Sequence, residues 1–222
     1  MDLGQLDGFF ALWNNAQGPM LREKRWGNFP DYGQTLVEHA NSILLVGRLV
    51  LSIAARPVDS LLFMDCVILH DHGEPLTGGD EHAGNKTQGK DVKEWVAFER
   101  LLQTQPKSLY EPLLRAFTLQ YVRKKGMWRN LPAPGGLIII ELERTHAYEA
   151  GLFEFVERFD YVLSAYAGYQ RGVQNTQETM LEHTLGNQIS KLDALTDEFP
   201  ELGALWSYRL KAELQALVLC SL

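Results

Sequence analysis

Residues 60–80 read SLLFMDCVILHDHGEPLTGGD, an apolar segment followed at once by a cluster of histidine and acidic side chains. The nearly continuous apolar run from Leu61 to Leu69 predicts a helix buried in the core. This helix would place His70 and Asp71 at its end, with Glu74 shortly after them. Imidazole nitrogens and carboxylate oxygens are ligands that divalent metal ions use beside a catalytic water. The stretch therefore predicts chemistry as well as a fold.

Most of the remaining chain repeats apolar residues at helical spacing, which predicts an all-α fold, a helical bundle. The segment 33–55 is expected to be a buried helix that carries His39, and it ends at Arg56-Pro57 because proline cannot continue the preceding helix. Further helices are expected at about 91–102, 109–125 and 141–169, with two more within 174–222. The run Leu137–Ile140 is a strand or the start of a buried helix, because periodicity cannot decide at this length.

Two sets of apolar residues define faces of the expected helices. The inner face of the helix at 141–169 is expected to hold Phe155, Phe159, Val162, Leu163 and Tyr166. One face of the last amphipathic segment is expected to hold Leu202, Leu205, Trp206, Leu210, Leu214 and Leu217. This second face is interpreted as core or as the interface of a homodimer.

Length and composition limit the function classes. A chain of 222 residues with 45% hydrophobic residues is expected to form a single domain. Its formal net charge of −7 argues against a surface that binds duplex nucleic acid. Cys66 and Cys220 are too few for a disulfide framework, which favours a cytoplasmic setting. No basic leader precedes an apolar stretch, and Gly47 and Arg48 interrupt the longest apolar run well before the ~18 residues of a membrane span, so no membrane association is expected.

Four residues combine a metal-ligand side chain with a mostly apolar helical setting: His39, His70, Asp71 and Asp160. Asp160 lies in the middle of an expected helix, where a buried carboxylate is costly unless it is paired or metal-bound. One such histidine alone is more often a hydrogen-bonded core residue, but three helices that each supply ligand types can converge on one ion. Mixed nitrogen and oxygen donors suit Mn, Co, Fe, Ni or Zn, and suit Mg less well.

These motifs carry a family resemblance. Glu38-His39, His70-Asp71, the segment Glu74–Asp80 and the segment Phe155–Asp160 occur in the order and helical context of the HD-domain metal-dependent phosphohydrolases. Within that superfamily the chain most resembles the bacterial 5′-deoxynucleotidases and their eukaryotic relatives. The resemblance covers a core of about residues 24–170. The family usually has Leu-Thr-Gly-Asp after its glutamate, whereas this chain has an additional glycine before Asp80. Compared with the family pattern, segment 126–147 looks like an insertion, and segment 174–222 looks like a C-terminal helical extension.

The resemblance implies a role for each matching position. His39, His70, Asp71 and Asp160 would be the ligands of one divalent ion. Catalysis would fall to Glu74, which would position or activate the attacking water, and to Asp80 as the second acidic residue of the loop. Substrate would be bound by Arg25, through its phosphate, and by Trp26, near the nucleoside. The alternatives for these residues are a surface cation for Arg25, a core anchor for Trp26 and a capping loop carboxylate for Glu74. His72 and His82 would serve a second metal only in a two-metal member of the family. A dinuclear oxygenase, which would also hold two metal ions, is a further alternative.

The function expected from the resemblance is removal of phosphate from (deoxy)nucleoside 5′-monophosphates by a metal-bound water. A triphosphohydrolase acting on dNTPs is an alternative, because the same kind of site can attack at the α-phosphorus if the pocket admits a longer chain. A non-catalytic metal-binding module that signals through partners is another. The expected partners are thus a small nucleotide substrate and, through the C-terminal face, a second copy of the chain.

Overall fold

The computed structural model describes residues 20–21, 25, 29–78, 87–175 and 178–219, and these ranges are all-α, as predicted, with no strand among them. The elements in chain order are η2 (Pro30–Tyr32), α3 (Leu36–Ile53), α4 (Ser60–Leu69), α5 (Gln88–Leu102), α6 (Lys107–Leu119), α7 (Met127–Asn130), α8 (Gly135–Thr145), α9 (Ala147–Gln170), α10 (Met180–Glu198), η3 (Pro200–Ala204) and α11 (Tyr208–Leu219).

Side-chain caps fix the starts of the two helices that lead to the metal-ligand residues. Thr35 and Glu38 form a capping box at α3: the Glu38 amide donates to Thr35 Oγ1 (3.2 Å), and the Thr35 amide donates to Glu38 Oε2 (2.7 Å). At α4, Asp59 Oδ1 accepts from the Leu62 amide (3.0 Å). These caps place His39 one turn into α3 and leave His70 as the residue that ends α4.

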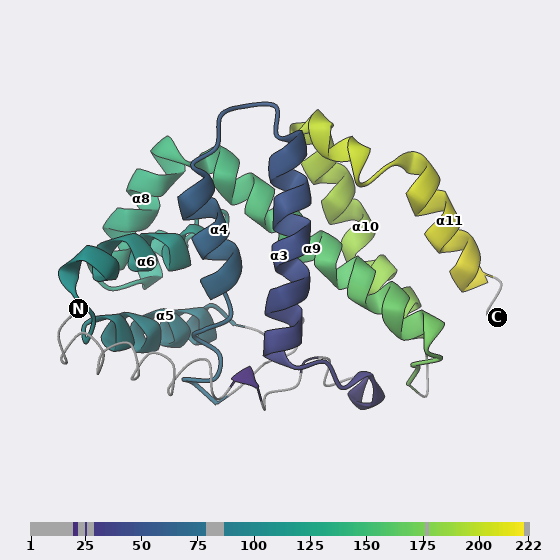
Figure 1. Ribbon diagram of the computed structural model, residues 1–222, viewed down its shortest axis with the longest axis horizontal. Helices are drawn as coiled ribbons and strands as arrows, with labels where there is room; N and C mark the ends of the chain where they lie inside the picture. Colours follow the sequence, from purple (N-terminus) through teal and green to yellow (C-terminus); the bar gives the residue numbers. More distant parts are fainter. Residues whose placement is uncertain (1–19, 22–24, 26–28, 79–86, 176–177, 220–222) are drawn as a thin grey trace.

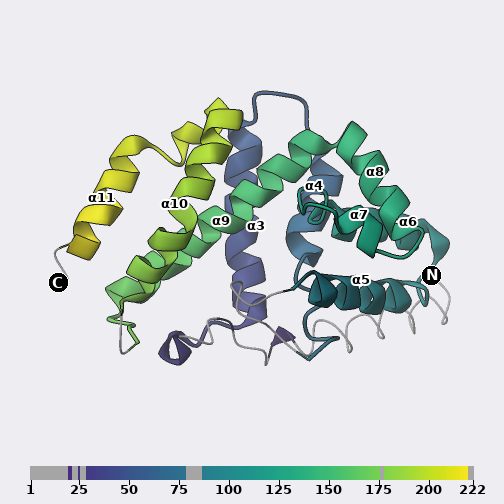
Figure 2. The same ribbon diagram turned by 180° about the vertical axis from the view of Figure 1, so that it is seen from behind.

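The long helix α9 is the centre of the arrangement. It crosses behind α3 in Figure 1, and Figure 2 shows α10 lying along its other side. Helices α3, α4, α8 and α10 all contact it, and its Phe155 and Val156 are fully buried. Helix α3 is long and apolar enough to cross a membrane, but the core helices of globular proteins have the same length and composition. It packs against α4 and α9. We therefore treat α3 as a core helix.

A second group of helices packs on the other side of α4. Helix α6 contacts α4, and α5 and α8 contact α6. Trp95 and Phe98 of α5 are buried, and the Trp95 indole donates from Nε1 to Thr118 Oγ1 on α6 (2.9 Å). Because both sides of α4 are covered by helices, its end is held firmly in place.

Several predicted boundaries are wrong. Helix α6 ends at Leu119 rather than near residue 125, because the backbone changes to tight turns, in which the Tyr121 and Val122 amides donate to carbonyls three residues back. The expected helix at 141–169 is in fact parts of two helices, α8 and α9, which meet at His146, where φ is −136°. The undecided run Leu137–Ile140 is helical and lies within α8.

The predicted apolar faces are only partly correct. On α9, Phe155, Phe159 and Val162 are buried as expected, but Leu163 is exposed. The face predicted for the last segment does not belong to one helix: Leu202 lies in η3, Leu205 and Trp206 lie in the turn after it, and the other three residues lie in α11. Within that set, Leu202, Trp206 and Leu214 are buried, while Leu205, Leu210 and Leu217 are half-buried. The homodimer stays a prediction.

Close packing at Gly136 generates a test of the fold. A Cβ atom at this position of α8 would overlap the carbonyl oxygen of Trp128, whereas a Cβ at Gly186 of α10 would meet no atom within 4 Å. We expect Gly136→Ala to lower the free energy of unfolding by about 1–3 kcal/mol, because backbone must shift. The matched Gly186→Ala should raise it by about 0.4–1 kcal/mol through the entropy of the unfolded chain. Urea unfolding measures both, and equal midpoints would contradict the packing of α7 against α8.

Candidate metal centre

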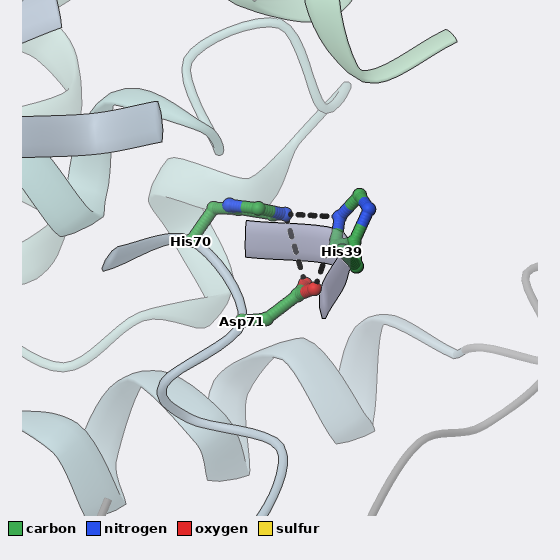
Figure 3. Close-up of side chains that lie close together, drawn as sticks. All are labelled: His39, His70 and Asp71. Atoms are coloured by element: carbon green, nitrogen blue, oxygen red, sulfur yellow. Dashed lines mark hydrogen bonds and ion pairs between the residues drawn. The ribbon is translucent and has the colours of Figure 1, made fainter. Parts of the chain in front are cut away.

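Three of the four predicted ligands lie together in the core. His39 comes from α3, and His70 and Asp71 follow α4, so that their side chains meet between the two helices (Figure 3). His39 Nε2 lies 3.1 Å from His70 Nε2 and 3.3 Å from Asp71 Oδ2, and His70 Nε2 lies 3.2 Å from Asp71 Oδ1. One donor atom from each residue lies within 4.8 Å of the others, and all three residues are buried. This group can hold a metal ion.

The backbone after α4 positions the side chains of His70 and Asp71. The His70 amide still donates to the Cys66 carbonyl (3.0 Å), as in a helix, but the His72 and Glu74 amides donate to the Leu69 and Asp71 carbonyls in tight turns (2.8 and 3.1 Å). From the residue after α6, Gln120 Nε2 donates to the His70 carbonyl (2.9 Å). The turn that carries His70 and Asp71 is therefore fixed by its own bonds and by a neighbouring segment.

The second nitrogen of each imidazole already has an acceptor. His70 Nδ1 lies 2.9 Å from the Val67 carbonyl oxygen, and His39 Nδ1 lies 2.9 Å from Asp160 Oδ2. A carbonyl or an ionised carboxylate can only accept, so Nδ1 is the donor in both rings, and a neutral ring then has its lone pair on Nε2. Two such Nε2 atoms face each other beside the Asp71 carboxylate. This electron-rich arrangement needs a cation, either a proton or a metal ion, and the donor set fits a divalent metal.

The pKa shifts follow from the same contacts. Burial lowers the pKa of His39, and the positive charge of Arg25 lowers it further. Burial alone would also lower the pKa of His70, but the Asp71 carboxylate outweighs this, and that pKa lies above its ordinary value. Burial would raise the pKa of Asp71, yet the two histidines hold it well below its usual range. The carboxylate thus stays ionised, and His70 is the site of the proton that a metal ion would displace.

Asp160 does not join the three-residue group. Its Oδ2 accepts from His39 Nδ1, and its Oδ1 accepts a short hydrogen bond from the Ser42 hydroxyl. The carboxylate is fully buried, and these two hydrogen bonds pair it, which offsets the cost of burying a charge in an apolar setting. Burial would raise the pKa of Asp160, but the bond from His39 lowers it. The prediction that Asp160 is itself a ligand stays a prediction.

Arg25 is buried, so the alternative that it is a surface cation is wrong. Its amide donates to the Gln34 carbonyl (2.8 Å), and its guanidinium carbon lies 4.8 Å from the centre of the Tyr161 ring on α9. After burial, its charge is the next cause that lowers the pKa of His39. Arg25 therefore brings a positive charge to the metal-ligand group from a segment outside the helices.

The other residues that the sequence analysis considered for the site are Glu74, Trp26, Asp80, His72 and His82, and only Glu74 and His72 lie within the described residues. Glu74 is buried in the turn that follows the ligand pair. Trp26, Asp80 and His82 lie outside the described residues. The ring of His72 is buried against Phe98, and burial lowers its pKa to about 4.

Three buried or half-buried residues near the centre were missed by the sequence analysis: Ser42, Glu94 and Tyr161. Ser42 follows His39 by three positions on one helix, a spacing that places side chains on the same face and could have revealed it. Glu94 of α5 is fully buried, and a Cβ at Gly73 would lie 2.7 Å from its Cβ. Tyr161 follows Asp160, but nothing in its sequence setting indicates the contact with Arg25.

The chain was compared with family models, curated proteins and solved structures, and none of them matches it. The assignment of this site therefore rests on its geometry and on the resemblance of its motifs.

The geometry predicts that a divalent ion stabilises the folded protein. Binding to the folded state alone adds about 2.7 kcal/mol to the free energy of unfolding at one hundred times the Kd. Thermal unfolding of metal-stripped protein titrated with Mn²⁺, Co²⁺, Zn²⁺ and Mg²⁺ should show this gain, with the smallest effect for Mg²⁺. His39→Ala should abolish it. The matched control is His146→Ala, because that ring lies between α8 and α9 beside Asp59 and not in the ligand group. A gain that survives His39→Ala would contradict the site.

Proposed function

We propose that the protein is a metal-dependent phosphohydrolase that removes phosphate from (deoxy)nucleoside 5′-monophosphates. The observation that carries the proposal is the convergence of His39 Nε2, His70 Nε2 and an Asp71 carboxylate oxygen in a buried position. The resemblance to the HD-domain phosphohydrolases supplies the reaction class and the substrate class.

The donor set favours a borderline divalent ion. Two imidazole nitrogens and a carboxylate suit Mn, Co, Fe, Ni or Zn better than Mg, which prefers oxygen ligands and retains several waters. When bound, such an ion would act as a Lewis acid that lowers the pKa of a coordinated water and polarises a phosphoryl oxygen.

Arg25 supports phosphate as the ligand. The positive charge of Arg25 acts on the whole group, because it lowers the pKa of Asp71 and of Asp160 as well as that of His39. The planar guanidinium matches phosphate oxygens with paired N–H donors. Its stacking on Tyr161 holds the group in one orientation, which reduces the entropy lost when a phosphate binds.

Glu74 is the residue we assign to proton transfer. The turn that begins at Asp71 holds it, since its amide donates to the Asp71 carbonyl (3.1 Å), and its side chain is buried. A carboxylate in this position can accept the proton of an attacking water without serving as a ligand itself.

Two substitutions in this turn separate metal binding from proton transfer. Asp71→Asn should lose metal and activity together, because the only carboxylate of the three-residue group becomes neutral. Glu74→Ala should keep the metal and lower kcat by about 10²–10⁴-fold. The measurements are metal content and release of phosphate from dNMPs, NMPs and dNTPs. Asp65→Asn is the matched control, since this half-buried carboxylate of α4 lies outside the ligand group.

The products decide between the reaction classes. Orthophosphate from a monophosphate supports the proposal, whereas tripolyphosphate from a dNTP would replace it with the triphosphohydrolase. Unchanged turnover in both variants would remove these residues from the mechanism. A metal-loaded protein that hydrolyses none of these nucleotides would favour a non-catalytic metal-binding module.

Removal of the buried cation tests the phosphate assignment separately. Arg25→Ala should lower kcat/KM for monophosphates by about 10–100-fold, the value of a charged hydrogen bond of about 1.5–3 kcal/mol, while metal affinity stays equal or increases. Arg48→Ala, at an exposed position of α3, should leave both unchanged. An Arg25→Ala variant with normal kcat/KM would show that the guanidinium has only a structural role.

A further inference from the structure

A cavity outside the metal-ligand group lies between the turn that follows α6 and the helices α8 and α9. Its volume is about 580 Å³, which is within the range of pockets that hold small molecules. Glu143 of α8 and Glu154 of α9 border it, and most of its wall comes from residues between 122 and 128. None of the residues that line it belongs to the metal-ligand group.

Helix α9 reaches the cavity and the metal-ligand group with different faces. Glu154 precedes Asp160 by six positions, which corresponds to about 9 Å along the helix axis and a rotation of about 240°. The Asp160 side chain contacts His39, whereas Glu154 accepts from Arg123 Nε in the turn after α6 (2.6 Å). A ligand in the cavity would therefore be separate from a substrate at the metal centre.

The turn that forms most of the wall is basic. Residues 123–129 read RKKGMWR, with four cations and no acidic side chain, in a chain whose net charge is −7. Arg123 and Lys124 are paired with carboxylates of other helices. Lys125 and Arg129 are exposed and form no ion pair with any residue in the described part of the chain. Positive charge thus remains at this turn for an anionic ligand.

An exposed aromatic ring lies beside these cations. Trp128 of α7 lines the cavity, and 41% of its surface is exposed. The guanidinium carbon of Arg129 lies 4.7 Å from the centre of the Trp128 ring, which holds the ring against the arginine. Aromatic side chains beside basic residues bind nucleic-acid bases by stacking, and every base offers a π-face.

We propose that this cavity is a second ligand site, which binds a nucleotide independently of the metal centre. Lys125 and Arg129 supply the charge for the phosphates, and Trp128 supplies a surface on which the base stacks. The exposed carboxylate of Glu143 accepts from a ribose hydroxyl or from an amino group of the base. A single nucleotide fits better than a nucleic acid strand, because Glu143 and Glu154 border the cavity and repel a longer polyanion.

The test follows the indole N–H of Trp128 in ¹H–¹⁵N NMR spectra of the full chain, stripped of metal so that nucleotides are not hydrolysed. The chain has five tryptophans, and the Trp128 signal is the one that Trp128→Phe removes. The probes are ADP, adenosine and pyrophosphate. We expect ADP to shift this signal with saturation. Pyrophosphate has no ring to stack and should bind at least about fivefold more weakly, and adenosine, which has no charge, should also bind more weakly.

Three variants, each read through the Trp128 signal, locate the binding. Lys125→Ala should weaken ADP binding by about 2–5-fold, the value of an exposed ion pair. The matched control is Lys107→Ala, an exposed lysine at the start of α6, which should leave ADP binding unchanged. Arg25→Ala removes a phosphate contact at the metal centre and should also leave it unchanged.

Several results would overturn the proposal. One is a Trp128 signal that does not shift in millimolar ADP, and another is a shift that Arg25→Ala abolishes, because the signal would then report on the metal centre. Pyrophosphate that binds as tightly as ADP would show an anion site without a base. A single-stranded oligonucleotide that binds more tightly than ADP would replace the nucleotide with a nucleic acid strand.

These readouts are independent of catalysis. If ADP shifts the Trp128 signal as expected but no nucleotide is hydrolysed by the metal-loaded protein, the proposed function fails and the second site stands. If nucleotides are hydrolysed but the Trp128 signal does not respond, only the second site fails.

Discussion

The meeting of two imidazole nitrogens and a carboxylate is the interaction on which the rest of the site depends. His39 Nε2 and His70 Nε2 lie 3.1 Å apart, and the remaining nitrogen of each ring faces an acceptor. Such an arrangement is unfavourable in an apolar core unless positive charge is present. The protein maintains it through packing: the caps of α3 and α4 set where the two helices begin, and helices on both sides of α4 hold its end.

The all-α class and the positions of His39, His70 and Asp71 were predictable from the sequence, because they depend on residues that are neighbours along the chain. An apolar run followed by His70-Asp71 indicates a buried helix that ends in ligands, and His39 lies on the buried side of another apolar helix. The all-α class follows from the spacing of apolar residues along the chain. The break at His146 was missed because the residues on both sides of it favour helix, so that periodicity alone gives one continuous element.

The finer geometry of the site depends on contacts between distant segments, which a single sequence does not contain. Whether Asp160 faces the ion or the back of His39 is set by how α9 crosses α3 and by the rotation of the imidazole ring. The burial of Arg25 depends in the same way on its contact with Tyr161. Ser42 is the exception, since its spacing from His39 was visible in the sequence.

Helix α9 presents two neighbouring residues to the two halves of the site. Asp160 contacts His39 of the candidate metal group, and the next residue, Tyr161, lies under the guanidinium of Arg25. Because both supports belong to one rigid helix, they cannot be displaced separately. A small slide or rotation of α9 against α3 would loosen the histidine and release the arginine in the same movement. Binding of a cation and binding of an anion would then be thermodynamically coupled through this helix, each favouring the α9 position that suits the other.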